Sequence, residues 1–173
     1  MKKVSINIYN FSELSEQAKK VALSEFQDIN TDYDWWNFTY EDAAQIGLKI
    51  TSFDIMYHPT CSGELTLSAN EVAQNIINNH GESCDTYKCA QSFMSEWQPV
   101  FIDYMDESSP NYESLETSDK LQDIEDSFLK ELLKCYAVML ENEFEYLTSE
   151  EAIIETIEAN DYKFTEDGKF YTL

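Results

Sequence analysis

The sequence contains no arginine. Its 11 basic residues are all lysine, and 34 aspartates and glutamates give a formal net charge of −23 over 173 residues. Arginine pairs with phosphate through two hydrogen bonds and stacks on bases, and nucleic-acid-binding proteins depend on basic patches that neutralise phosphates. We therefore expect neither direct binding to nucleic acid nor binding to an anionic membrane.

Glycine and histidine are also scarce. The four glycines, at positions 47, 63, 81 and 168, are at least 16 residues apart. Phosphate-binding loops need glycines a few residues apart, so neither the dinucleotide-binding spacing nor the P-loop spacing exists. Histidine, which transfers protons most readily near neutral pH, occurs only at His58 and His80. We expect no cofactor and no enzymatic activity.

Long apolar runs are absent as well. No run approaches the roughly 18 residues of a membrane-spanning helix, and the first residues lead into a segment with Asn7 and Asn10 instead of an apolar signal core. We expect a cytoplasmic protein. In that reducing compartment, Cys61, Cys84, Cys89 and Cys135 are expected to be free thiols.

Apolar and aromatic residues are plentiful. They make up 43% and 14% of the chain, which excludes disorder over its whole length, and 173 residues suit one domain spanning 1–173. Capped helices alternate with hairpin signals without a regular strand-helix-strand order. This pattern predicts an α+β fold, in which a small antiparallel sheet packs against several helices, one of them long and C-terminal.

Residue patterns place the expected elements in the first half of the chain. Alternation of Val4, Ile6 and Ile8 predicts a strand, and Ser12 is the expected cap of the helix that follows. The remaining elements are a helix ending before Gly47, a hairpin from segments 48–57 and 64–67, and a helix opened by the capping box at 68–71.

In the second half, a helix over 87–97 is expected to be interrupted near Pro99, and 106–117 is expected to be a loop. A helix of about 25 to 30 residues should begin near Ser118, and a capping box at 148–151 should open the next. Asp167-Gly168 predicts a terminal hairpin. The expected core comprises Phe26, Ile46, Ile50, Val72, Ile76, Met94, Phe128, Leu132 and Met139.

Negative charge is concentrated towards the C-terminus, with −8 in residues 1–86 and −15 in residues 87–173. Like charges four residues apart oppose a helix, so helix stability does not explain the glutamates that lack a nearby cation. These are Glu141, Glu143, Glu145, Glu150, Glu151, Glu155 and Glu158. Three interpretations are open: a solvated face, adaptation to salt, or imitation of nucleic acid. DNA carries one charge per about 1.7 Å, so the net charge corresponds to about 11 to 12 base pairs.

Two further groups of residues suggest other chemistry. Nitrogen and sulfur ligands for zinc are available at His58, Cys61, His80, Cys84 and Cys89. Their spacing matches no common zinc finger, so we predict no metal site, and a zinc-stabilised or thiol-using protein, including a small hydrolase, is the alternative. Trp35 and Trp36 are either core residues or an apolar patch by which the chain, as an adaptor, would bind a host protein; this adaptor is the other alternative function. Adjacent positions on a helix favour one tryptophan in the core and one partly exposed.

Several segments together carry a family resemblance: Phe11-Ser12-Glu13-Leu14-Ser15, Asp34-Trp35-Trp36, Tyr40-Glu41-Asp42-Ala43, Ile46-Gly47-Leu48 and His80-Gly81-Glu82. With them the chain resembles a family of small acidic proteins of bacteriophages and prophages. The resemblance implies an anti-defence context, of the anti-CRISPR or antirestriction kind, and brings no catalytic residues. We therefore expect a non-enzymatic inhibitor that binds the basic groove of a host nuclease, a CRISPR effector before a restriction enzyme.

Overall fold

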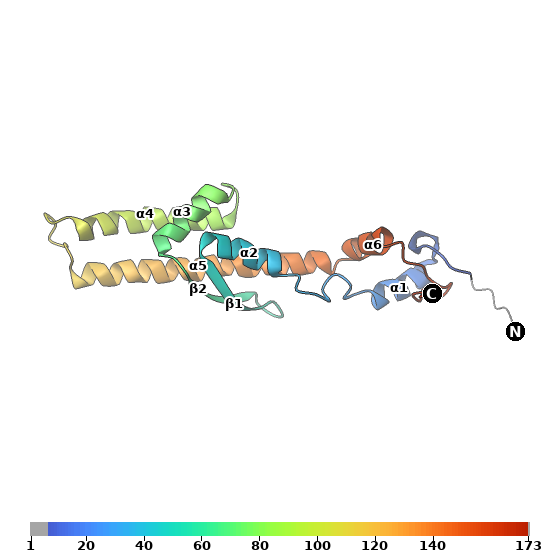
Figure 1. Cartoon of the computed structure of the whole chain (residues 1–173). Helices are drawn as coiled ribbons and strands as arrows, with labels where there is room; N and C mark the ends of the chain where they lie inside the picture. The colour runs from blue at the N-terminus through green and yellow to red at the C-terminus, as the bar shows by residue number, and fades with distance from the viewer. Residues whose placement is uncertain (1–6, 173) are drawn as a thin grey trace. The chain divides into compact units, whose positions relative to one another are not determined.

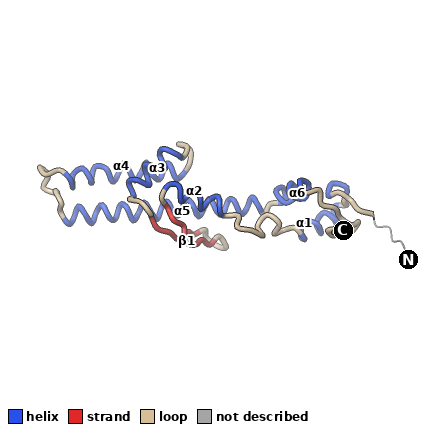
Figure 2. Tube along the Cα trace, viewed as in Figure 1, coloured by secondary structure: helices blue, strands red, loops and turns tan. Residues whose placement is uncertain are grey.

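The computed structural model describes residues 7–172, which form helices and one antiparallel two-stranded sheet (Figures 1 and 2). In chain order the elements are the 3-10 helix η1 (Phe11–Glu13), α1 (Glu16–Glu25), α2 (Asn37–Ile46), β1 (Leu48–Asp54), β2 (Thr60–Leu65), α3 (Ala69–Asn79), α4 (Asp85–Met105), α5 (Leu115–Leu147) and α6 (Glu150–Ala159). The α+β class is confirmed, and the long helix is α5. Val4 and Ile6 of the expected first strand lie outside the described residues.

Contacts divide the chain into two compact units. The terminal unit comprises the described parts of Met1–Trp35 and Asn142–Leu173, and the central unit is Trp36–Glu141. Each has its own buried core. The single domain expected over residues 1–173 stays a prediction.

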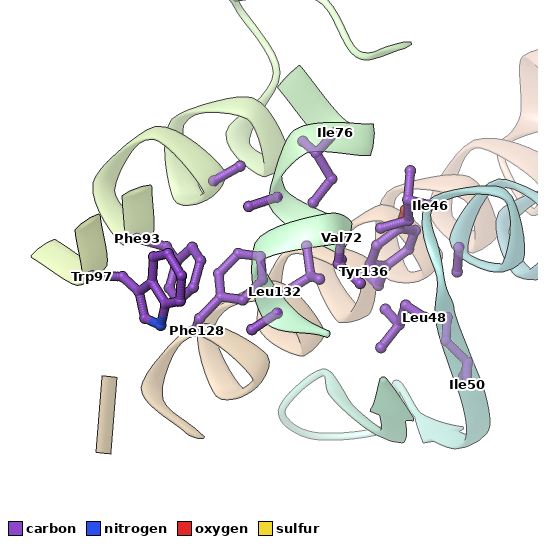
Figure 3. Close-up of a cluster of buried hydrophobic side chains, with 14 of the residues drawn as sticks. Ile46, Leu48, Ile50, Val72, Ile76, Phe93, Trp97, Phe128, Leu132 and Tyr136 are labelled. Carbon is purple, nitrogen blue, oxygen red and sulfur yellow. The ribbon is translucent and has the colours of Figure 1, made fainter. Parts of the chain in front are cut away.

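The central unit is built around α5, on which the hairpin and the shorter helices pack. Leu48 pairs with Leu65 in the β1–β2 ladder, and the αL conformation of Gly47 (φ 94°) ends α2 so that β1 can follow directly. Ile46 and Leu48 meet Val72 and Tyr136 in the core, while the stacked rings of Phe93 and Phe128, 4.4 Å apart, join α4 to α5 (Figure 3). The capping box of Ser68 and Glu71 opens α3 as expected.

The terminal unit packs α1 against α6 and the last residues of the chain. Phe11, Ile153 and Phe164 are among its buried residues. The expected terminal hairpin is reduced to isolated bridges, because Phe164 pairs with both Tyr9 and Phe170. The buried Asn30 holds the unit together through its amide, which donates to the Leu147 carbonyl (3.0 Å) and accepts from the Thr156 hydroxyl (2.7 Å).

Several expectations need correction. Helix α4 continues through Pro99, because the proline is exposed while Trp97 and Phe101 stack across it with ring centres 4.3 Å apart. Met139 is 39% exposed and not in the core, since the buried side of α5 passes through Tyr136 and Leu140 instead. Phe26 and Met94 are only partly buried.

The boundaries of several elements also differ from the expected ones. The helix caps lie a few residues from the expected ones: Ser15 caps α1 and Ser149 caps α6, each accepting a backbone N–H. Helix α5 begins at Leu115, inside the loop expected over 106–117. The turn of the hairpin lies at 55–59 and not at 58–63.

Candidate functional site

The carboxylates singled out from the sequence lie on the end of α5 and along α6. Six of them are exposed and belong to the terminal unit: Glu143, Glu145, Glu150, Glu151, Glu155 and Glu158. We call this group the acidic helix surface. Ala152, Ile153 and Ile157 are buried, so α6 turns its apolar side to the core and leaves its glutamates in solvent. Glu141 is half-buried and belongs to the central unit.

Within residues 7–172, no cation pairs with any glutamate of the acidic helix surface. Among the described residues, their side chains accept one hydrogen bond, and it is long: the Tyr146 hydroxyl donates to Glu155 over 3.5 Å. The lysines Lys19, Lys163 and Lys169 pair with other carboxylates instead. The negative charge of the acidic helix surface is therefore available to a partner.

Helix dipoles explain only part of this surface. Glu150 and Glu151 lie in the first turn of α6, where the positive end of the dipole stabilises negative charge. Glu145 and Glu158 lie in the last turns of α5 and α6, where a cation is favoured, and neither turn contains a basic residue. The negative charges of these two glutamates therefore oppose the dipoles of the helices on which they lie.

We expect the double substitution Glu145→Gln, Glu158→Gln to stabilise the folded protein by about 1 kcal/mol, because it removes two charges that oppose the helix dipoles. The matched control is Glu150→Gln, Glu151→Gln, which removes two favourably placed charges and should destabilise the fold by a similar amount. Urea unfolding at low salt measures both. A shift in the same direction for the two pairs would contradict this explanation.

The two tryptophans differ in burial as expected, although neither lies within a helix, because α2 begins only at Asn37. Trp35 is 7% exposed, and its ring lies 5.6 Å from that of Phe144 in the terminal unit. Trp36 is half-buried in the central unit, 5.7 Å from the ring of Phe53. Trp35 therefore offers almost no surface to a partner and is a core residue, and an apolar contact with a host protein would depend on Trp36.

The histidines and cysteines do not form the cluster considered for zinc. His58 is exposed in the turn between β1 and β2, and Cys84 is exposed before α4. Cys61 is half-buried on β2, while Cys89 lies beside Cys135 of α5. In the described part of the chain, no three His, Cys, Asp or Glu side chains are arranged to hold a metal ion.

His80 instead joins a polar chain that sequence reasoning missed. Its Nδ1 lies 2.7 Å from the hydroxyl of Thr86, and its Nε2 lies 3.7 Å from Asp42. The buried hydroxyl of Tyr136 donates to Asp42 over 2.7 Å. Burial, reinforced by this hydrogen bond, raises the pKa of Tyr136, so the phenol remains a neutral donor. The one signal in the sequence was a tyrosine at a core position of a long helix, since a buried hydroxyl needs a partner.

The polar chain resembles a catalytic triad only in its residue types. Thr86, the one residue in the position of a nucleophile, is 3% exposed, so its hydroxyl is closed to a substrate. The four residues of the polar chain come from α2, α4, α5 and the end of α3. The polar chain therefore connects these helices to one another through their side chains.

We expect Tyr136→Phe to destabilise the central unit by about 1 to 2 kcal/mol, because Asp42 loses its buried donor while the packing of the ring is retained. Tyr57→Phe is the control, since Tyr57 is 92% exposed. Thermal unfolding of both variants measures the effect, and equal melting temperatures would show that the hydrogen bond contributes nothing.

Comparisons with protein-family models, with curated proteins and with solved structures gave no match to this chain. None of the helices in residues 7–172 combines the length and the apolar character needed to cross a lipid bilayer.

Proposed function

We propose that the protein is a non-enzymatic inhibitor of a host defence nuclease, acting in the cytoplasm of the host cell. The observation that supports this most is the acidic helix surface, whose exposed glutamates have no cationic partner among the described residues. Two of them oppose the dipoles of their own helices. Charge retained at a cost to stability is typical of a surface that serves binding.

The complementary surface is a groove lined with lysine and arginine that normally holds phosphates. Glutamates fixed on folded helices would occupy phosphate positions and exclude the nucleic acid. A net charge of −23 would also attract the basic groove from a distance and speed association. The resemblance to small acidic phage and prophage proteins implies an anti-defence context, which favours a CRISPR effector as the target, with a restriction enzyme as the second candidate.

A titration of nuclease activity tests this proposal. Purified CRISPR effector nucleases and type II restriction endonucleases are incubated with increasing amounts of the protein before their DNA substrates are added. We expect cleavage by at least one effector to fall linearly and end near one protein per nuclease. Inhibition at catalytic, far substoichiometric amounts would contradict a binding mechanism, and full activity of every nuclease at tenfold excess would refute the proposal.

A further inference from the structure

The thiols of Cys89 on α4 and Cys135 on α5 meet in the central unit. The two side chains line the same groove and lie close enough for each thiol to shift the pKa of the other, although they are far apart in the sequence. Both are free and half-buried. Two thiols in contact have a chemistry that a single cysteine lacks, because oxidation can join them in a disulfide.

The pair is not sealed in the core. Cys89 and Cys135 line an open groove of about 390 Å³ between α4 and α5, whose lining also includes Phe93, Phe128 and Lys88. Phe93 and Phe128 are the stacked pair seen in Figure 3. A groove of this size admits a small oxidant to the sulfur atoms.

The two thiols are not equivalent. Interaction with the Cys89 thiol lowers the pKa of Cys135, while the same interaction, together with burial, raises the pKa of Cys89. Cys135 therefore loses its proton first, and the thiolate is the reactive form of cysteine. By contrast, burial raises the pKa of Cys61 to about 11, and Cys84 is exposed ahead of α4.

We propose that Cys89 and Cys135 form a peroxide-reactive thiol pair, in which Cys135 is oxidised first and Cys89 completes an intramolecular disulfide. In the first step the Cys135 thiolate attacks one peroxide oxygen and the O–O bond breaks. Cys135 becomes a sulfenic acid, and the other oxygen leaves as water after taking a proton. In the second step the Cys89 sulfur attacks Cys135, the S–S bond forms, and hydroxide leaves with the Cys89 proton as water. The two thiols are oxidised and the peroxide is reduced.

A disulfide at this position would connect α4 covalently to α5. Such a link restricts the unfolded chain and stabilises the native state, by more as the enclosed loop lengthens. We expect the melting temperature of the oxidised protein to rise by about 5 to 10 °C relative to the reduced protein. Dithiothreitol should reverse the change.

The experiment begins with Cys61→Ser, Cys84→Ser, a background that retains only the pair. After treatment with equimolar hydrogen peroxide, we expect intact-mass spectra of the monomer to show the loss of two hydrogen atoms, and peptide mapping to join the peptides of residues 89 and 135. A monomer that keeps both thiols, or a disulfide between two chains, would overturn the proposal.

Single variants in this background separate the two roles. With Cys89→Ser, dimedone should trap a sulfenic acid on Cys135. With Cys135→Ser, oxidation of Cys89 should be at least about threefold slower, because burial still raises the pKa of Cys89 when the Cys135 thiol is absent. Equal rates would refute the assigned order. Circular dichroism of each variant, and of the corresponding alanine variants, verifies that the fold is intact.

Discussion

Changing Glu143, Glu150, Glu151 and Glu155 to lysine is expected to weaken inhibition of the target nuclease by about 100- to 1000-fold. Each substitution replaces an attraction to a basic groove with a repulsion, and a few kcal/mol in total accounts for a change of that size. All four side chains are exposed, so the fold should survive. The measurement is the inhibition constant of the variant, with circular dichroism as the test of folding.

The matched control changes Glu41, Glu82, Glu107 and Asp123 to lysine. These carboxylates are also exposed, and they belong to the central unit. The neighbouring Asp106 is left unchanged because it accepts hydrogen bonds from Ser108, so its substitution would also disturb the loop. Both variants have the same net charge, so they separate a defined surface from bulk charge. An equal loss of inhibition in both would indicate bulk charge, and no loss in either would rule out imitation of nucleic acid.

The largest expected effect on stability comes from Gly168→Ala. Gly168 has φ 84°, and a Cβ atom there would lie 2.1 Å from the carbonyl oxygen of Ala18 on α1. Because that neighbour is backbone, it cannot move aside as a flexible side chain would. We expect a loss of about 3 kcal/mol or more in the free energy of unfolding, from the strained φ and the overlap together.

Gly81→Ala is the control for this substitution. A Cβ at Gly81 would meet only the sulfur of Cys84, at 3.9 Å. Its unfolding free energy should stay within about 0.5 kcal/mol of the parent protein. Urea unfolding followed by near-ultraviolet circular dichroism measures both variants, since aromatic rings such as Phe26 and Tyr162 stack in the terminal unit. Similar curves for the two glycine variants would show that the turn at Gly168 tolerates a side chain.

The sequence predicted the parts of the fold that local physics determines. The capping box at Ser68 and Glu71 and the terminating Gly47 depend on residues within a few positions of one another, and both form as expected. The long helix α5 follows from its repeating apolar positions. The same pattern wrongly predicted Met139 as a core residue. From Phe128 onward the buried side chains recur every four residues, at Leu132, Tyr136 and Leu140, so that Met139 falls outside the core.

Contacts between distant residues were beyond such reasoning. Nothing near Tyr136 in the sequence indicates that Asp42 accepts its hydrogen bond, and nothing near Cys89 indicates that Cys135 lies beside it. The continuation of α4 through Pro99 likewise depends on packing, which offsets the lost backbone hydrogen bond. For the acidic helix surface, the sequence identified the glutamates, and the fold adds that six are exposed and that Glu141 is not.

The central claim is that the acidic helix surface occupies the nucleic-acid groove of a nuclease, and competition tests it most directly. A fluorescent DNA duplex of about 12 base pairs, whose charge matches the net charge of the protein, is first bound to the free nuclease that the protein inhibits. The complex is then titrated with the protein at several salt concentrations. We predict that the protein displaces the duplex completely and that its affinity falls as salt rises, because salt screens charges over about 10 Å at 0.1 M. A ternary complex that retains the duplex, with an affinity independent of salt, would contradict the claim.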